Sequence, residues 1–265
     1  METVYFAYLA YAAIGVVSGV MAGLLGIGGG LITVPSLFFL FSYLKFPQAY
    51  VMHLAIGTSL AAMIFNTLSS SRAHNKKRAV MWPLFKKTVP GLVLGGIIGG
   101  VVADYISSVI LEIIFGVFLC FIGFLFFRRI QPHFKECSVP KNPIFSLIFM
   151  AIGIFSVILG LGGGLFSVPT LTAFRVPQKS AIATSAVITC LMTFIGAIAF
   201  LILGLETAQL PDSLGFINIP AFLIIGIVSV FFAPLGVKWA HELPDQILRR
   251  IFGIVLILTG ITMLV

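Results

Sequence analysis

The chain has 265 residues, of which 60% are hydrophobic and only 9% are charged, and its mean hydropathy is +1.16. Soluble domains carry roughly 25% charged residues, so this composition excludes an ordinary water-soluble enzyme. The apolar runs are long and continuous, without the alternation of a transmembrane β-barrel, and predict an all-α polytopic membrane protein. The formal net charge of +8 does not indicate nucleic-acid binding, because membrane proteins collect Lys and Arg in their cytoplasmic loops.

Ten apolar segments follow one another along the chain, separated by short polar breaks. A crossing helix needs about 20 apolar residues, so two of the segments, 31–44 and 164–174, are too short to cross a bilayer comfortably. Each of these two follows a cluster of glycines directly. The sequence leaves open whether they cross fully or form re-entrant hairpins with the segments before them. The predicted segments are 5–27, 31–44, 50–70, 80–102, 108–127, 144–161, 164–174, 178–204, 217–240 and 247–265.

The glycine clusters belong to an internal repeat. Residues 26–37 align without gaps on residues 160–171, and each copy contains four glycines in five residues, then a hydroxyl residue and a proline. Further along, Ala-Ile-Gly-Thr-Ser at 55–59 matches Ala-Ile-Ala-Thr-Ser at 181–185. Because the order of the matches is the same in both halves, we predict two repeats of about five helical segments each.

The two repeats are expected to have opposite orientations in the membrane, because each contains an odd number of segments. If the loop at 71–79 is cytoplasmic, every Lys and Arg except Lys45 falls on the cytoplasmic side, as the positive-inside rule requires. We therefore predict inverted-topology repeats in a multi-pass protein of the inner (plasma) membrane. The predicted division is a first transmembrane repeat at 1–130, a cytoplasmic linker at 131–142 and a second, inverted repeat at 143–265.

The glycine clusters predict breaks in two helices. Glycine destabilises a helix interior by up to about 1 kcal/mol relative to alanine, so we expect broken or re-entrant helices there. Thr33 and Ser167 are the expected N-caps of new helices that begin near them, with Pro35 and Pro169 in the first turn. The free N–H groups and the positive end of such helices favour an anion, and inverted repeats with broken helices commonly enclose a substrate site. The predicted substrate-binding residues here are Gly28, Gly29, Gly30, Thr33, Gly162, Gly163, Gly164 and Ser167.

The alternative explanation of a glycine cluster is close helix packing. We assign that role to the glycines elsewhere that recur every four residues, where small side chains let two helices approach each other. These are Gly15, Gly19 and Gly23, the pair Gly95 and Gly99, and the pair Gly96 and Gly100.

Two Thr-Ser pairs, repeated between the halves, are further candidates for substrate binding. They are Thr58 with Ser59 and Thr184 with Ser185, and the alternative is that their hydroxyls bond to helix backbones. Asn66 lies about two turns beyond Thr58 and is a candidate for the polar lining of a site, or for a bond between helices.

His53 is a candidate for a proton-linked or gating function. It lies near the outer start of its segment and has no histidine counterpart in the second repeat. Histidine titrates close to neutral pH, which suits a switch.

The glycine blocks and the Ala-x-x-Thr-Ser elements resemble those of the TauE/SafE family of membrane transporters, and the resemblance covers the whole chain. It implies transport of sulfur-containing anions, because members are described as exporters of sulfite, sulfoacetate or related organosulfonates. It also implies substrate roles for the glycine blocks and the Thr-Ser pairs. The second copy departs from the first in having Ala183 in place of Gly57 and Ser167 in place of Thr33, which leaves open whether both copies contribute equally.

The predicted function is therefore export of a small sulfur-containing anion, such as sulfite or an organosulfonate, by alternating access. An anion leaves an inside-negative cell downhill by roughly 2.3 kcal/mol per charge per 100 mV, so the membrane potential is a sufficient driving force. The alternative is a proton-coupled anion importer that uses His53.

The sequence does not indicate an enzyme. It contains no HExxH motif, no GxSxG motif and no pair of intramembrane aspartates, so we expect no catalytic residue, no metal site and no cofactor. The expected partners are the small anionic substrate and the lipid bilayer, without nucleic acid, and a homodimer is one arrangement that the sequence allows.

Overall fold

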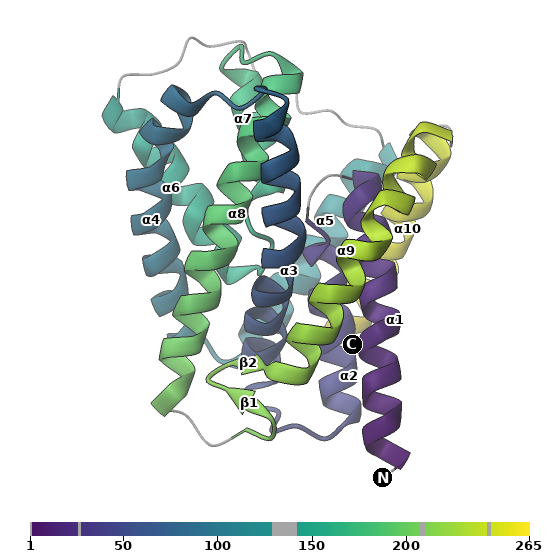
Figure 1. Cartoon of the computed structure of the whole chain (residues 1–265). Helices are drawn as coiled ribbons and strands as arrows, with labels where there is room; N and C mark the ends of the chain where they lie inside the picture. Colours follow the sequence, from purple (N-terminus) through teal and green to yellow (C-terminus); the bar gives the residue numbers. More distant parts are fainter. Residues whose placement is uncertain (1, 26–27, 129–141, 207–209, 243–244) are drawn as a thin grey trace.

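The computed structural model describes residues 2–25, 28–128, 142–206, 210–242 and 245–265, and α-helices make up nearly all of it (Figure 1). Within these residues, ten α-helices match the ten predicted segments in order. The predicted linker at 131–142 lies outside the described residues except for Asn142, where α6 begins. The helices are α1 (Glu2–Leu25), α2 (Gly30–Tyr43), α3 (Val51–Lys76), α4 (Trp82–Tyr105), α5 (Ser108–Arg128), α6 (Asn142–Ile158), α7 (Gly164–Ala173), α8 (Gln178–Leu203), α9 (Ile219–Glu242) and α10 (Asp245–Leu264).

The described helices differ in length. Six of them are long and apolar enough to cross a membrane, namely α1, α3, α4, α5, α8 and α9. In contrast, α2 has 14 residues and α7 has 10, so at 1.5 Å per residue they extend over only about 21 and about 15 Å. Figure 1 shows α2 toward one end of the molecule and α7 toward the other. The protein is therefore an all-α polytopic membrane protein that contains two half-length helices.

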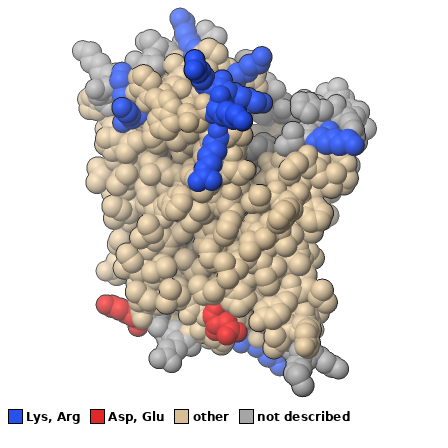
Figure 2. All heavy atoms as spheres, viewed as in Figure 1, with Lys and Arg blue, Asp and Glu red and all other residues tan. Residues whose placement is uncertain are grey.

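Charge separates the two ends of the molecule. Most of the visible Lys and Arg side chains gather at one end, while Asp and Glu side chains and a small basic patch are visible at the other, with a largely uncharged belt between them (Figure 2). The basic end, as we name it, includes Arg72 and Lys76 near the end of α3 and Lys86 near the start of α4. The opposite end is called the acidic end. An uncharged belt of this kind is what a bilayer core requires.

A small hairpin at the acidic end was not predicted from the sequence. Strand β1 (Ser213–Leu214) pairs antiparallel with β2 (Ile217–Asn218), after a short 3₁₀ helix η1 (Gly204–Glu206) that follows α8. Gly215 makes the turn with a φ of 57°, a conformation that glycine adopts without steric cost. The hairpin leads directly into α9, so it determines where that helix begins.

The glycines at four-residue spacing bring helices into close contact, as predicted. A Cβ atom on Gly19 of α1 would lie 2.8 Å from the Cα of Ser229 on α9. On α4, a Cβ on Gly99 would lie 2.7 Å from the carbonyl oxygen of Ile154 on α6. On its other face, Gly96 would meet Ile195 of α8 at the same distance. These glycines therefore hold α1 against α9, and α4 against both α6 and α8.

The pattern of helix contacts stays the same when the two halves of the chain are exchanged. Helix α1 packs on α9 and its counterpart α6 packs on α4, while α5 pairs with α10. The central helices α3 and α8 contact each other, and each also contacts the fourth helix of the opposite half. The short helices α2 and α7 pack on α3 and α8 respectively. The internal repeat of the sequence therefore has a counterpart in the packing.

We predict that Gly95→Ala destabilises the protein by about 1–3 kcal/mol, because overpacking a tight contact carries a cost of that size. The new Cβ would collide with the carbonyl oxygen of Met150 on α6. The neighbouring Leu94 is 55% exposed on the bilayer-facing side of the same helix, so Leu94→Ala is the matched control and should stay within about 0.5 kcal/mol. Thermal melting of the purified protein in detergent measures both, and equal losses would contradict the packing role of Gly95.

Candidate functional site

The first glycine cluster interrupts the chain between α1 and α2. Gly28 and Gly29 have φ angles of 87° and 84°, and Gly29 is the N-cap residue of α2. The carbonyl oxygen of Gly29 accepts hydrogen bonds from the N–H groups of Ile32 and Thr33, both at 3.1 Å. Left-handed glycines thus turn the chain sharply enough for α2 to begin at Gly30.

The second cluster does the same between α6 and α7. Gly160 ends α6 with a φ of 64°, its N–H donates to Val157 and the N–H of Leu161 donates to Ser156, which is a Schellman motif. Gly163 then caps α7 with a φ of 92°, and α7 begins at Gly164. The predicted breaks are confirmed in both copies.

The predicted N-cap roles of Thr33 and Ser167 are wrong. The glycine caps lie four residues before the predicted caps, so these hydroxyls lie in the first turn and donate back to the carbonyls of Gly29 and Gly163 at 3.0 and 2.9 Å. Such back-bonding to the residue four positions earlier is common for Ser and Thr inside helices.

The two prolines also lie one turn deeper than predicted, because the helices start earlier. Pro35 and Pro169 are inside α2 and α7 rather than in the first turn. A proline has no N–H group, so each removes one hydrogen bond from a half-length helix.

The two breaks meet at the centre of the molecule. A Cβ atom on Gly30 would lie 2.7 Å from the carbonyl oxygen of Gly160 and 3.0 Å from the sulfur of Met63 on α3. The methyl group of Met63 would meet a Cβ on Gly28 at 2.6 Å and one on Gly162 at 3.3 Å. One methionine therefore packs against both glycine turns, and the positive φ angles of Gly28 and Gly162 would strain any larger residue there.

A cluster of threonines surrounds the same point, and we name Thr67, Thr189 and Thr193 the threonine cluster. Thr67 of α3 and Thr193 of α8 have their hydroxyl oxygens 3.2 Å apart. The methyl groups of Thr189 and Thr193 would lie 3.0 and 2.9 Å from a Cβ on Gly162. The sequence interpretation missed this cluster, although continuing the alignment of 55–59 with 181–185 by two turns pairs Thr67 with Thr193.

The first residue of each predicted Thr-Ser pair accepts a hydrogen bond from the backbone at the start of another helix. Thr58 accepts a hydrogen bond from the N–H of Asn218 at 2.9 Å, and Thr184 accepts one from the N–H of Met81 at 3.0 Å. Asn218 immediately precedes α9 and Met81 immediately precedes α4. The two bonds are equivalent under exchange of the halves, and each ties a central helix of one half to the fourth helix of the other.

The second residues of these pairs make different bonds in the two halves. Ser185 lies 2.6 Å from the hydroxyl of Ser167, whereas Ser59 donates to the sulfur of Met63 at 3.8 Å. Thr33, the counterpart of Ser167, is instead 2.7 Å from the hydroxyl of Ser18 on α1. The repeat is therefore unequal close to the glycine turns.

His53 lies apart from the glycine turns, at the end of α3 that meets the hairpin. Its Nε2 atom is 3.0 Å from the carbonyl oxygen of Ala103, and its ring lies 5.1 Å from that of Phe216. The side chain is buried, and its Nδ1 atom has no hydrogen-bond partner.

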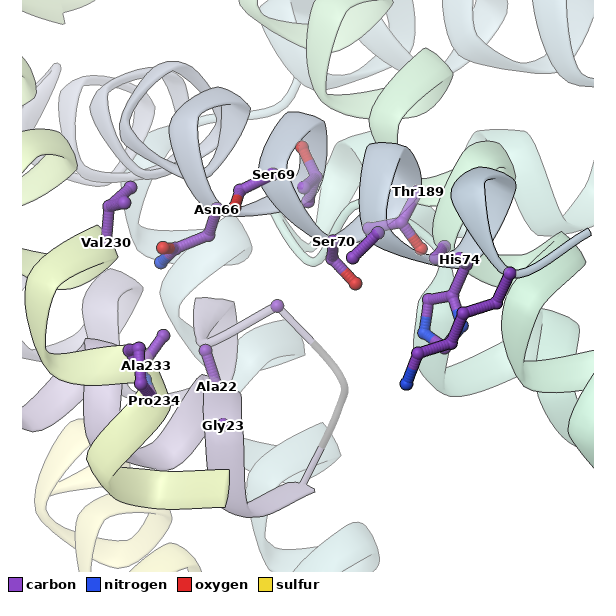
Figure 3. A pocket seen from close by; sticks show the side chains of 15 residues that line it. Ala22, Gly23, Asn66, Ser69, Ser70, His74, Thr189, Val230, Ala233 and Pro234 are labelled. Carbon is purple, nitrogen blue, oxygen red and sulfur yellow. The ribbon is translucent and has the colours of Figure 1, made fainter. Parts of the chain in front are cut away.

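A cavity of about 550 Å³ lies between α1, α3, α8 and α9. It is lined at the basic end by His74 of α3 and by Lys77, which follows α3, and it reaches Gly28, Thr67 and Thr189 in its depth. Figure 3 shows Ser69, Ser70 and His74 along α3, with Ala233 and Pro234 on α9 opposite. Among the lining residues of this stretch, Lys77, Ser70 and Ser69 are exposed, whereas Thr67 is buried. The cavity is therefore a path, lined by both polar and apolar residues, from the basic end to the glycine turn of the first repeat.

Asn66 forms part of the wall of this cavity. Its Nδ2 atom donates to the hydroxyl of Ser229 on α9 at 2.8 Å, while its Oδ1 atom is buried without a hydrogen-bond partner. Of the predicted site residues, Gly28 and Asn66 line the cavity. The other predicted site residues are packed around the glycine turns or within the helix contacts described above. They are Gly29, Gly30, Thr33, Thr58, Ser59, Gly162, Gly163, Gly164, Ser167, Thr184, Ser185 and His53.

Comparison with known proteins gives a consistent result. The family model described as "Sulfite exporter TauE/SafE" matches residues 11–263. A probable membrane transporter protein of Haemophilus influenzae is 33% identical over 94% of this chain and 95% of its own length. One from Methanocaldococcus jannaschii is 29% identical over 95% and 93% of the two chains. No solved structure matches this chain.

The match of the family model covers nearly the whole chain, including both glycine breaks and the helices around the cavity. The named relatives are described as transporters rather than enzymes. This chain is a membrane transporter that belongs to the sulfite exporter TauE/SafE family.

Proposed function

We propose that this protein exports a small sulfur-containing oxyanion, such as sulfite or an organosulfonate, across the inner (plasma) membrane. The observation that carries the proposal is the cavity that leads from the basic end to the glycine turn at Gly28. Among the described residues that line it, Lys77 carries a positive charge, several carry hydroxyl groups, and none is an aspartate or glutamate. An anion entering from the basic end therefore meets attractive charge and no carboxylate.

The inner end of the cavity offers backbone dipoles in place of a buried cation. Gly28 lies two residues before α2, and the first N–H groups of a helix have no partners within the helix. The N-terminus of a helix carries a partial positive charge that stabilises anions. Irregular backbone at membrane depth is tolerated where it lines a water-filled cavity, which agrees with the position of Gly28.

Alternating access is supported by the difference between the two ends of the molecule. The cavity opens at the basic end, where it lies between the ends of α1, α3 and α9. Toward the acidic end, a Cβ on Gly196 of α8 would lie 2.7 Å from Leu60 of α3, and a Cβ on Gly100 of α4 would lie 2.7 Å from Ala199 of α8. We propose that the halves are inverted repeats and that this is the inward-open state, with the basic end in the cytoplasm.

Within this mechanism the predicted site residues take two roles. We assign substrate contact to the glycine turns and to Asn66, which lie at or beside the cavity. We assign a positioning role to Thr58 and Thr184, because their hydroxyls bind the backbone at the starts of α9 and α4. In that role they would keep α9 and α4 in position against the central helices α3 and α8 while the protein changes state.

We predict that Gly29→Ala reduces transport of sulfite about tenfold or more. Its φ of 84° forces alanine into the left-handed region, and the new Cβ would lie 2.7 Å from the hydroxyl of Ser18. Backbone strain of this kind costs on the order of 1–3 kcal/mol. Flux into proteoliposomes measures the effect. Gly116→Ala, which adds a methyl group between α5 and α10 away from the cavity, is the control and should retain most of the activity.

We predict that transport carries net charge. In proteoliposomes held at a potential of 100 mV, a monoanion should distribute toward the positive side with a concentration ratio of about 50, which corresponds to about 2.3 kcal/mol. Sulfite flux measured at several potentials set with potassium and valinomycin tests this. The same rate and the same final distribution at every potential would contradict potential-driven export.

We predict that His53→Gln leaves the response to a pH gradient unchanged. His53 is buried between Ala103 and Phe216 and does not line the cavity, so it is not on the path of the anion. Uptake against an imposed gradient, compared between the wild type and the variant, measures this. Loss of gradient-driven accumulation in the variant would instead favour proton-coupled import.

A further inference from the structure

We propose that Asn66 selects substrates that carry a hydrogen-bond donor in addition to their negative charge, so that protonated or hydroxyl-bearing monoanions are preferred over anions without an O–H or N–H group. The proposal rests on the proposed function, because it concerns the cavity that the anion would enter. It names a specificity-determining residue and narrows the substrate class.

The orientation of the Asn66 amide is determined by its neighbour. Ser229 donates its single hydroxyl proton to the carbonyl oxygen of Gly226 at 2.9 Å, so toward Asn66 it can act only as an acceptor. The amide must therefore present Nδ2 to Ser229, at 2.8 Å. The opposite atom, Oδ1, is consequently the group left without a partner.

The Asn66 amide oxygen would be stabilised by a hydrogen-bond donor. Asn66 is only 8% exposed, and a buried acceptor without a hydrogen bond is unfavourable. The side chain reaches from α3 toward α9 beside Val230 at the cavity wall (Figure 3). The χ2 torsion of asparagine has a broad energy well, so a small rotation can bring Oδ1 to the cavity surface without movement of α3.

The hydroxyls of Thr67 and Thr189, which also line the cavity, present lone pairs rather than protons. Thr67 donates to the carbonyl oxygen of Met63 at 2.9 Å, and Thr189 donates to that of Ser185 at 2.8 Å. Each hydroxyl has one proton, so both threonines face the cavity as acceptors. The depth of the cavity therefore combines acceptors on α3 and α8 with the anion-stabilising glycine turn that precedes α2.

This combination discriminates between classes of oxyanion. A fully deprotonated oxyanion offers only lone pairs, which repel the Asn66 oxygen. Hydrogensulfite or a hydroxyalkyl sulfonate offers the same negative charge to the glycine turn and an O–H group to Asn66. Sites built to bind a substrate hydroxyl reject analogues that lack it, because their own polar groups stay unpaired.

The test uses two sulfonates with the same number of non-hydrogen atoms, 2-hydroxyethanesulfonate and 1-propanesulfonate. Binding of each to the purified protein is measured by calorimetry, and flux of sulfite is measured separately in proteoliposomes. The wild type should bind 2-hydroxyethanesulfonate about fivefold more tightly, the size expected for one hydrogen bond. In Asn66→Leu, which keeps the number and branching of the side-chain heavy atoms and removes the acceptor, the two affinities should differ by less than about twofold.

The matched control is Met192→Leu, which alters the position of α8 that corresponds to Asn66 in the repeat and removes no polar group. This variant should keep the wild-type preference. Asn66→Ala provides a second variant without the acceptor, and the melting temperature of each variant shows whether it is folded.

Equal binding of the two sulfonates by the wild type, or a preference that persists in both Asn66 variants, would overturn the proposal. Binding of neither sulfonate would overturn it as well. If sulfite flux is observed in any of these cases, export of sulfur oxyanions stands and only the role of Asn66 fails. Absence of sulfite flux with an intact binding preference would instead overturn the proposed substrate.

Discussion

A helix that stops inside an apolar medium leaves backbone N–H and C=O groups without partners, and this constraint explains the centre of the molecule. Each of the two breaks is built from glycines in the left-handed conformation, which allow the chain to turn within a few residues. The breaks also shield each other, since Gly30 packs against the carbonyl group of Gly160. Each break is therefore buried in protein or faces the cavity, and backbone of this kind is stable in a membrane where it is buried in protein or lines a water-filled cavity.

The pairing of the breaks makes the two halves dependent on each other. Thr58 binds the start of α9 and Thr184 binds the start of α4, so each central helix positions a helix of the opposite half. At the same time the halves differ in detail, because Ser167 bonds to Ser185 while Thr33 bonds to Ser18. The shared contacts are therefore those that join the two halves, and the differences lie next to the glycine turns.

Much of the fold was predictable because it follows from local composition. The ten helices follow the apolar runs, and the breaks follow the glycine clusters, since both effects act within a few residues. The prediction failed where two local signals competed. Thr33 and Ser167 have the side chains of N-caps, but the left-handed Gly29 and Gly163 start the helices earlier and leave the hydroxyls to bond backward. The hairpin around Gly215 was missed because two-residue strands carry almost no periodic pattern.

The amino-acid sequence by itself determined the class of protein, the order of the helices, the positions of the breaks and the duplication of the unit. All of these depend on hydrophobicity and backbone preference within short stretches, or on similarity between two stretches of one chain. Only the tertiary structure decided which polar residues face a cavity. Asn66 and Thr67 line it, whereas Thr58 is used to hold a helix start. The physical reason is that a hydroxyl or amide in a membrane bonds to whatever group packing brings within reach, and that group is up to 163 positions away in the sequence.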